Sequence, residues 1–146
     1  MSTRSRIAYK NENGHYVSVY CHWDGYPACN GKILLECYRN MDMVRDLISN
    51  GNLYSLGRSI GTRIDCAGSN NEPNIGGDDQ CIFYGRDRGE SGTEATVNNT
   101  LTGLKNHTEG CGGEWLYVFR DGAWFVADIL SSKKLHRLTV RVCREH

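Results

Sequence analysis

The chain has 146 residues and its formal charges sum to zero. This length is typical of one domain, so we expect a single domain over residues 1–146. A net charge of zero gives no strong signal for nucleic-acid binding or for attraction to anionic lipid. No apolar run approaches the roughly 18 residues that span a membrane, and the polar residues 1–6 predict that the chain carries no signal peptide.

The first structural signal along the chain is Asn13-Gly14, a dipeptide that favours a two-residue hairpin turn. We expect it to join two antiparallel strands over residues 3–10 and 15–23. In this register Glu12 faces His15, and every other pair of facing residues follows from that one.

The register assigns the side chains of the hairpin to the two faces of the sheet. One face is expected to carry Arg4, Arg6, Cys21 and Trp23, with His22 on the other. Because Cys21 and His22 then point apart, the sequence argues against a nucleophilic Cys–His pair, which needs the two groups within hydrogen-bond reach.

Two short helices are predicted next. Residues 31–39 have apolar side chains at helical spacing, and Asn30 is suited to cap this helix. A second helix is expected over residues 43–50, with Asp42 as its cap and Asn50-Gly51 as its stop signal. The apolar stripes of both helices are expected to face the core.

Residues 61–80 contain few apolar side chains. A loop of this length in a small domain is either functional or mobile. Residues 76–79 (GGDD) offer oxygen ligands for calcium, but they lack the ligand spacing of a known calcium loop. We therefore interpret residues 61–80 as a solvated surface loop.

The C-terminal part is rich in predicted strands. Asp121-Gly122 predicts a second hairpin, and alternating apolar residues predict a strand over residues 135–143. A short helix is one interpretation of residues 97–105. The predicted fold is α+β, an antiparallel sheet of about five or six strands with about two or three helices packed on one face. The strands of this part are expected over residues 81–85, 114–120, 123–128 and 135–143.

Seven cysteines are spread along the chain, at positions 21, 29, 37, 66, 81, 111 and 143. An odd number without an export signal predicts free thiols, most of them buried, in a cytoplasmic protein. Zinc is the alternative, bound by Cys21, His22 and Cys29 with Cys66, Cys81 or Cys111. No Cys-x-x-Cys spacing occurs, so we expect no metal and no other cofactor.

Two polar blocks are the strongest candidates for a functional site: residues 20–27 (YCHWDGYP) and residues 84–90 (YGRDRGE). A turn needs only Asp, Gly and Pro, whereas the first block also holds aromatic rings, an imidazole and a thiol. With two arginines of the first strand, the candidate ligand-binding residues are Arg4, Arg6, His22, Trp23, Asp24, Tyr26, Tyr84, Arg86, Asp87, Arg88 and Glu90.

These residue types are suited to a small anionic, nucleotide-like ligand. Guanidinium groups bind phosphate through paired hydrogen bonds, and aromatic rings stack on a base. Carboxylates accept hydrogen bonds from ribose hydroxyls. The alternative is a structural network of arginines, carboxylates and Trp23. Neither a P-loop nor a Gly-x-Gly-x-x-Gly motif is present. We expect a homo-oligomer to close such a pocket, because a small protein has few deep clefts.

Several segments resemble a family of small proteins of tailed bacteriophages and prophages. They are residues 2–7 (STRSRI), 20–27 (YCHWDGYP), 31–35 (GKILL) and 86–90 (RDRGE), with the closing hairpin around LYVF and WFV. The resemblance touches most of the chain and implies the cytosol of an infected bacterium as its setting. It implies no settled activity. Many members of that family have His where this chain has Gly85.

Three functions follow as hypotheses. The first is a phage protein that binds a small ligand, a sponge that sequesters a nucleotide-derived immune signal. The second is an inhibitor that binds a host protein directly through exposed aromatic residues. The third is a small hydrolase or transferase that uses His22, Asp24 or Glu90 as acid or base. The Gly85 departure weighs against the third, and we favour binding without catalysis.

Overall fold

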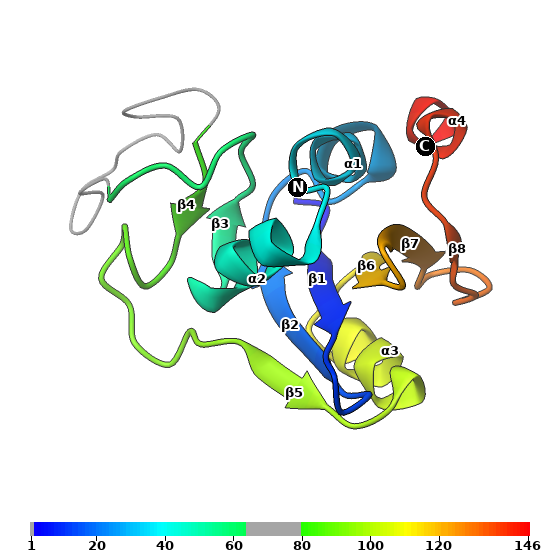
Figure 1. Ribbon diagram of the computed structural model, residues 1–146, viewed down its shortest axis with the longest axis horizontal. Helices are drawn as coiled ribbons and strands as arrows, with labels where there is room; N and C mark the ends of the chain where they lie inside the picture. Colours follow the sequence, from blue (N-terminus) through cyan, green and yellow to red (C-terminus); the bar gives the residue numbers. More distant parts are fainter. Residues whose placement is uncertain (1, 64–79) are drawn as a thin grey trace.

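A mixed β-sheet with helices on both of its faces forms the fold (Figure 1). The computed structural model describes residues 2–63 and 80–146. Within them the predicted α+β class is confirmed. The elements in chain order are β1 (Ser5–Lys10), β2 (Tyr16–Cys21), the π-helical turn η1 (Pro27–Gly31), α1 (Lys32–Cys37), α2 (Met41–Ser49), β3 (Leu53–Ser55), β4 (Ile82–Phe83), β5 (Thr96–Asn98), α3 (Leu101–Gly110), β6 (Trp115–Arg120), β7 (Ala123–Asp128), β8 (His136–Arg137) and α4 (Val140–Glu145).

In the described part of the chain the sheet has eight strands, in the order β4-β3-β2-β1-β6-β7-β8, with β5 paired to β2. It is mostly antiparallel, but β1 pairs with β6 and β2 pairs with β3 in parallel. The sequence predicted fewer strands because β3 and β5 have only three residues each. None of the helices in residues 2–63 and 80–146 has the length and hydrophobicity that a membrane crossing requires.

The register predicted for the first hairpin is wrong by one residue. The amide of Asn11 donates to the carbonyl of His15 over 2.8 Å, so the loop has three residues and ends at Gly14, whose φ is 80°. A turn closed by a left-handed glycine is a common three-residue hairpin loop. The Asn11 carboxamide oxygen stabilises it by accepting from the amides of Asn13 and His15.

The corrected register changes which side chains share a face. Ser5 now pairs with Cys21, and Arg6 pairs with Tyr20. Arg6 therefore lies on the face opposite to Cys21, because side chains alternate along a strand. The expected face with Arg4, Arg6, Cys21 and Trp23 together is not formed.

Both faces of the central strands are apolar and both are covered. Ile7 and Tyr117 pack in one core with residues of α1, α2 and α4. Ala8 and Leu116 pack in a second core with Leu104 of α3. The prediction of helices on one face alone is therefore wrong for α3. A strand that is apolar on both faces needs cover on both, since its exposed side would leave hydrophobic surface in water.

The first two helices begin differently from the prediction. Asn40, not Asp42, caps α2, and its side-chain oxygen accepts from the amide of Met43 over 2.9 Å. The predicted stop is confirmed, since α2 ends before Gly51, whose φ is 85°. Asn30 does not cap α1; it lies inside η1 and donates to the carbonyl of Trp23 over 3.0 Å.

The second hairpin is confirmed as predicted. Arg120 pairs with Ala123, and both turn residues have positive φ, 52° at Asp121 and 76° at Gly122. The predicted strand over residues 135–143 is wrong, because only β8 and then α4 form there. The side chain of Thr139 accepts from the amide of Val142, which is the geometry of a helix N-cap.

The described cysteines are free thiols. Cys21, Cys81 and Cys143 are buried and the other three are half-buried, so burial is less general than predicted. Cys66 and residues 76–79, with the calcium alternative, lie outside the described residues. In the part of the chain that is described, no group of three or more His, Cys, Asp or Glu side chains is arranged to hold a metal ion.

Candidate functional site

Five half-buried rings form an aromatic cluster at the β2-β3-β4 end of the sheet. The His22 ring lies 4.9 Å from Trp23 and 5.9 Å from Tyr54, with which it is nearly parallel. Tyr84 meets Tyr54 edge to face at 5.7 Å, and Tyr20 lies 5.9 Å from His22. We call Tyr20, His22, Trp23, Tyr54 and Tyr84 the aromatic cluster.

The sheet brings three of these rings together by its register. Cys21 pairs with Leu53, and Leu53 pairs with Phe83, all three buried on the face under α1 and α2. Because successive side chains point to opposite faces, the residue after each of them points to the other face. Those following residues are His22, Tyr54 and Tyr84. The core under α3 contains no residue of β3 or β4, so α3 leaves this area uncovered.

Asn52 fixes the position of the neighbouring strands. Its side-chain oxygen accepts from the amide of Tyr20 over 2.9 Å, and its carbonyl accepts from the amide of Tyr84 over 3.1 Å. The amide of His22 donates to the carbonyl of Leu53 over 3.1 Å. Three members of the aromatic cluster are therefore held by their backbones, which makes the surface that they form rigid.

Two arginines flank the aromatic cluster. The guanidinium carbon of Arg88 lies 4.6 Å from the Tyr54 ring centre and 5.8 Å from that of Tyr84. Its Nε donates to Glu90 over 3.3 Å, in a partly exposed ion pair. Arg4 is exposed and lies beside Tyr20 and His22, close enough to affect the pKa of both. The placement of Arg4 next to His22 also follows from the corrected register.

His22 is held as a neutral imidazole at neutral pH. Burial lowers its pKa, and the charges of Arg4 and Arg88 lower it further. Its Nδ1 lies 2.7 Å from the hydroxyl of Tyr20. Burial raises the pKa of Tyr20, and it raises the pKa of Tyr84 to about 12, so both phenols keep their protons. His22 and these two tyrosines are thus uncharged, and the charges of two guanidinium groups act on His22.

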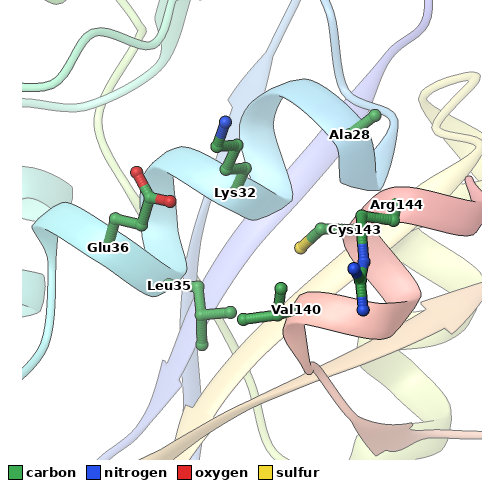
Figure 2. A pocket seen from close by; sticks show the side chains of 7 residues that line it. All are labelled: Ala28, Lys32, Leu35, Glu36, Val140, Cys143 and Arg144. Carbon is green, nitrogen blue, oxygen red and sulfur yellow. The ribbon is translucent and has the colours of Figure 1, made fainter.

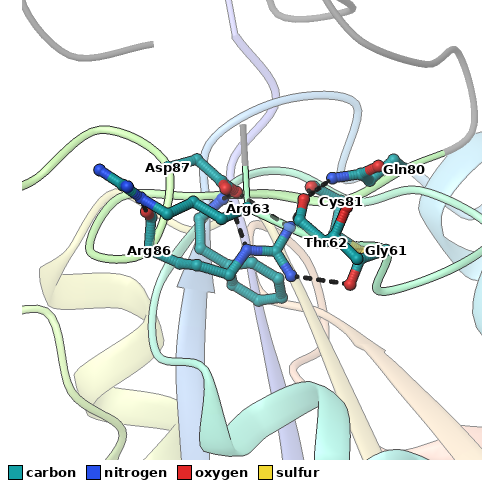
Figure 3. Close-up of polar contacts among 8 residues, drawn as sticks. Gly61, Thr62, Arg63, Gln80, Cys81, Arg86 and Asp87 are labelled. Carbon is teal, nitrogen blue, oxygen red and sulfur yellow. Dashed lines mark hydrogen bonds and ion pairs between the residues drawn. The ribbon is translucent and has the colours of Figure 1, made fainter. Parts of the chain in front are cut away.

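Arg86 and Asp87 lie outside this cluster and form a clasp (Figure 3). Arg86 makes a two-point ion pair with Asp87, at 3.0 and 3.1 Å, and its guanidinium also donates to the carbonyls of Gly61 and Cys81. A carboxylate oxygen of Asp87 accepts from the amide of Phe83 over 2.8 Å. All three guanidinium nitrogens of Arg86 make hydrogen bonds. These contacts favour the alternative in which this arginine belongs to a structural network.

Arg6 pairs with Tyr20 in the register, but its guanidinium contacts residues outside the aromatic cluster and it is buried, with 3% of its surface exposed. It donates to the hydroxyls of Ser18 and Thr96 over 3.0 and 2.9 Å, and its Nη1 reaches the sulfur of Cys111 at 4.0 Å. These partners are neutral groups, and among the described residues no carboxylate pairs with Arg6. Burial lowers the pKa of its guanidinium.

Asp24 and Tyr26 belong to the loop that follows β2. Asp24 is exposed with a φ of 56°, and Tyr26 is 37% exposed. Between them Gly25 packs tightly: its carbonyl accepts from the hydroxyl of Tyr117 over 2.6 Å, and a Cβ there would lie 2.8 Å from that of Ser5. Part of the unusual composition of residues 20–27 thus serves to hold the loop against the sheet.

The structure brings about half of the predicted site together. Arg4, His22, Trp23, Tyr84, Arg88 and Glu90 gather at the aromatic cluster, whereas Arg6, Asp24, Tyr26, Arg86 and Asp87 have other surroundings. Sequence reasoning missed Tyr20 and Tyr54 as members. Tyr54 lies in a strand of three residues, and its only signal is the apolar Leu53 before it.

Comparison of the chain with protein-family models, with curated proteins and with solved structures finds no match.

Proposed function

We propose that this protein binds a small nucleotide-derived anion at the aromatic cluster and retains it unchanged. The observation that carries this proposal is the guanidinium of Arg88 over the Tyr54 ring, with Arg4 opposite His22 in the β1–β2 register, beside rings that a base can stack on. Guanidinium groups bind phosphate oxygens through paired, charge-assisted hydrogen bonds, and aromatic faces add stacking.

The charges at the site support an anionic ligand. Arg4 and Arg88 carry two positive charges and Glu90 carries one negative charge, while His22 is neutral. An anion between the two arginines would reduce the repulsion that lowers the His22 pKa, so binding would favour protonation of this ring. The aromatic cluster is half-buried but open, and in our proposal a second copy of the chain closes it.

The resemblance to small phage proteins gives this binding a biological purpose. A protein that holds a nucleotide-derived signal without converting it would act as an anti-defence sponge in the cytosol of an infected bacterium. Direct binding of a host protein by the same half-buried rings is the competing function. The two functions predict different molecules bound to the purified protein, a nucleotide for the sponge and a host protein for the inhibitor.

The test is calorimetric titration with AMP, ADP and a cyclic dinucleotide, followed by mass spectrometry of the released ligand. We expect one of these to bind and to be recovered intact, and Arg88→Gln to weaken binding about tenfold or more, as for loss of a charge-assisted hydrogen bond. Arg45→Gln is the matched control, because Arg45 also lies over a tyrosine, Tyr9, at 5.7 Å but outside the cluster.

Two outcomes would contradict the proposal. The first is that Arg88→Gln and Arg45→Gln bind nucleotide as tightly as the original chain does. The second is that no nucleotide binds while a host protein co-purifies with the original chain and not with Tyr54→Ala, which would favour the inhibitor. Conversion of the nucleotide during the titration would favour an enzyme instead.

A further inference from the structure

A cavity of about 430 Å³ lies between α1 and α4, and none of its lining residues belongs to the aromatic cluster (Figure 2). Its volume falls within the range of small-molecule binding sites. Three apolar side chains and a thiol line it, together with Lys32, Glu36 and Arg144 at its rim. The apolar and thiol groups are Ala28, Leu35, Val140 and Cys143.

The apolar wall of this cavity is left in contact with solvent. Leu35 and Val140 point toward each other from the two helices, and the sulfur of Cys143 points into the space between them (Figure 2). Val140 is 64% exposed, although burial of a large aliphatic side chain is energetically favourable. Burial raises the pKa of the Cys143 thiol, so it remains a neutral, soft, apolar contact.

The charges at the rim do not cancel one another. Glu36 makes an ion pair with Arg58, which does not line the cavity, at 2.5 Å, and its charge also adds to the rise in the pKa of the Cys143 thiol. Lys32 and Arg144 make no ion pair with any residue that the structure describes. The lining therefore combines an apolar wall with two cations and one carboxylate, a net charge of +1 that comes from (+2) + (−1).

We propose that this cavity binds a small amphiphilic carboxylate, such as a medium-chain fatty acid. The aliphatic chain would lie against Leu35, Val140 and Cys143, where it removes apolar surface from water. The carboxylate would accept charge-assisted hydrogen bonds from Lys32 and Arg144. No member of the aromatic cluster lines this cavity, so the site is independent of nucleotide binding.

Octanoate is the probe for this site. Titration is followed by calorimetry and by the amide resonances of α1 and α4, with octylammonium as a ligand of equal length and opposite charge. We expect octanoate to bind and to shift those resonances, and octylammonium to bind at least tenfold more weakly. The Lys32→Gln/Arg144→Gln double variant should lose at least tenfold in octanoate affinity, since it removes both charged donors.

Arg141→Gln is the matched control, because Arg141 lies on the same helix, is 80% exposed and pairs with Glu145 away from the cavity. It should bind octanoate as the original chain does. All these positions are at the surface, and circular dichroism verifies the fold of each variant. Equal affinity for octanoate and octylammonium, or unchanged affinity in the double variant, would overturn the proposal. So would a dimer in sedimentation that buries Val140 and leaves octanoate without effect.

Discussion

The guanidinium of Arg88 lies 4.6 Å from the centre of the Tyr54 ring, although these two residues are 34 positions apart in a chain of 146. The contact joins the turn after β4 to β3, and it gives the aromatic cluster a positive charge directly above one of its rings. A cation in this position attracts an anion to the aromatic cluster.

Replacement of Tyr54 by Ala should weaken binding of the nucleotide that the original chain takes. A base stacked on an aromatic side chain contributes about 1–3 kcal/mol, so the dissociation constant should rise by roughly fivefold to a hundredfold. Tyr54→Phe keeps the ring and should bind within about twofold of the original. Calorimetry of both variants is the measurement, and equal losses in the two would assign the effect to the hydroxyl and not to the stacking surface.

Arg86→Ala should lower the free energy of unfolding by about 3 kcal/mol, because it leaves the carboxylate of Asp87, which is fully buried, without its two-point ion pair. Arg88→Ala should cost less than about 1 kcal/mol, since its ion pair with Glu90 is partly exposed. Urea unfolding of the two variants checks this. A larger loss in Arg88→Ala would show that the structural arginine has been misassigned.

The chain should be less stable at pH 5.5 than at pH 7.5. Burial and neighbouring arginines lower the pKa of His22 in the folded state below its ordinary value of 6.5, and burial lowers that of His107. As the pH falls through 6.5, these histidines bind protons in the unfolded chain but not yet in the folded chain, so the free energy of unfolding decreases. His22→Gln should reduce this dependence in urea unfolding series. An unchanged slope in that variant would contradict the assignment to His22.

Arg6→Met should cost less stability than Arg6→Ala. The buried guanidinium has only neutral partners, so an apolar side chain of similar length avoids the cost of burying a charge. Alanine would in addition leave a cavity, and we expect it to cost about 2 kcal/mol or more. Thermal and urea unfolding rank the two variants. If Met proves as costly as Ala, the hydrogen bonds to Ser18 and Thr96 outweigh the desolvation of the charge.

The two hairpins show what local sequence predicts and what it does not. Asp121-Gly122 adopts the expected two-residue turn, with positive φ at both positions. Asn13-Gly14 carries the same signal, but Asn11 accepts two amide hydrogen bonds from the loop and stabilises a turn that is one residue longer. Asn11 lies outside the Asn13-Gly14 dipeptide, so the dipeptide alone did not reveal the register. A one-residue difference then moved Arg6 to the other face.

The candidate site was predictable where chemistry is concentrated in the sequence. His22, Trp23, Tyr84 and Arg88 were found because their blocks hold more reactive and aromatic groups than a turn requires. Tyr54 was not, because its place beside His22 depends on the parallel pairing of β2 with β3, a contact between distant segments. Spacing along the chain carries no information about such a pairing. For the same reason it did not reveal that the guanidinium groups of Arg6 and Arg86 make their contacts outside the aromatic cluster.

The clasp of Arg86 makes one point of the surface suitable for protein engineering. Arg63 donates to the carbonyl of Arg86, and Gln80 donates to that of Thr62 (Figure 3). Ser59 also pairs with Gln80, so the residues that precede and follow 64–79 in the sequence, Arg63 and Gln80, are each held by a described contact. These contacts are made by residues 59, 62, 63, 80 and 86, none of which belongs to residues 64–79, so replacing that segment keeps all of these partners in the chain. A fluorescent reporter inserted there would adjoin the turn that carries Tyr84 and Arg88, and its emission would turn this protein into a sensor for its own ligand.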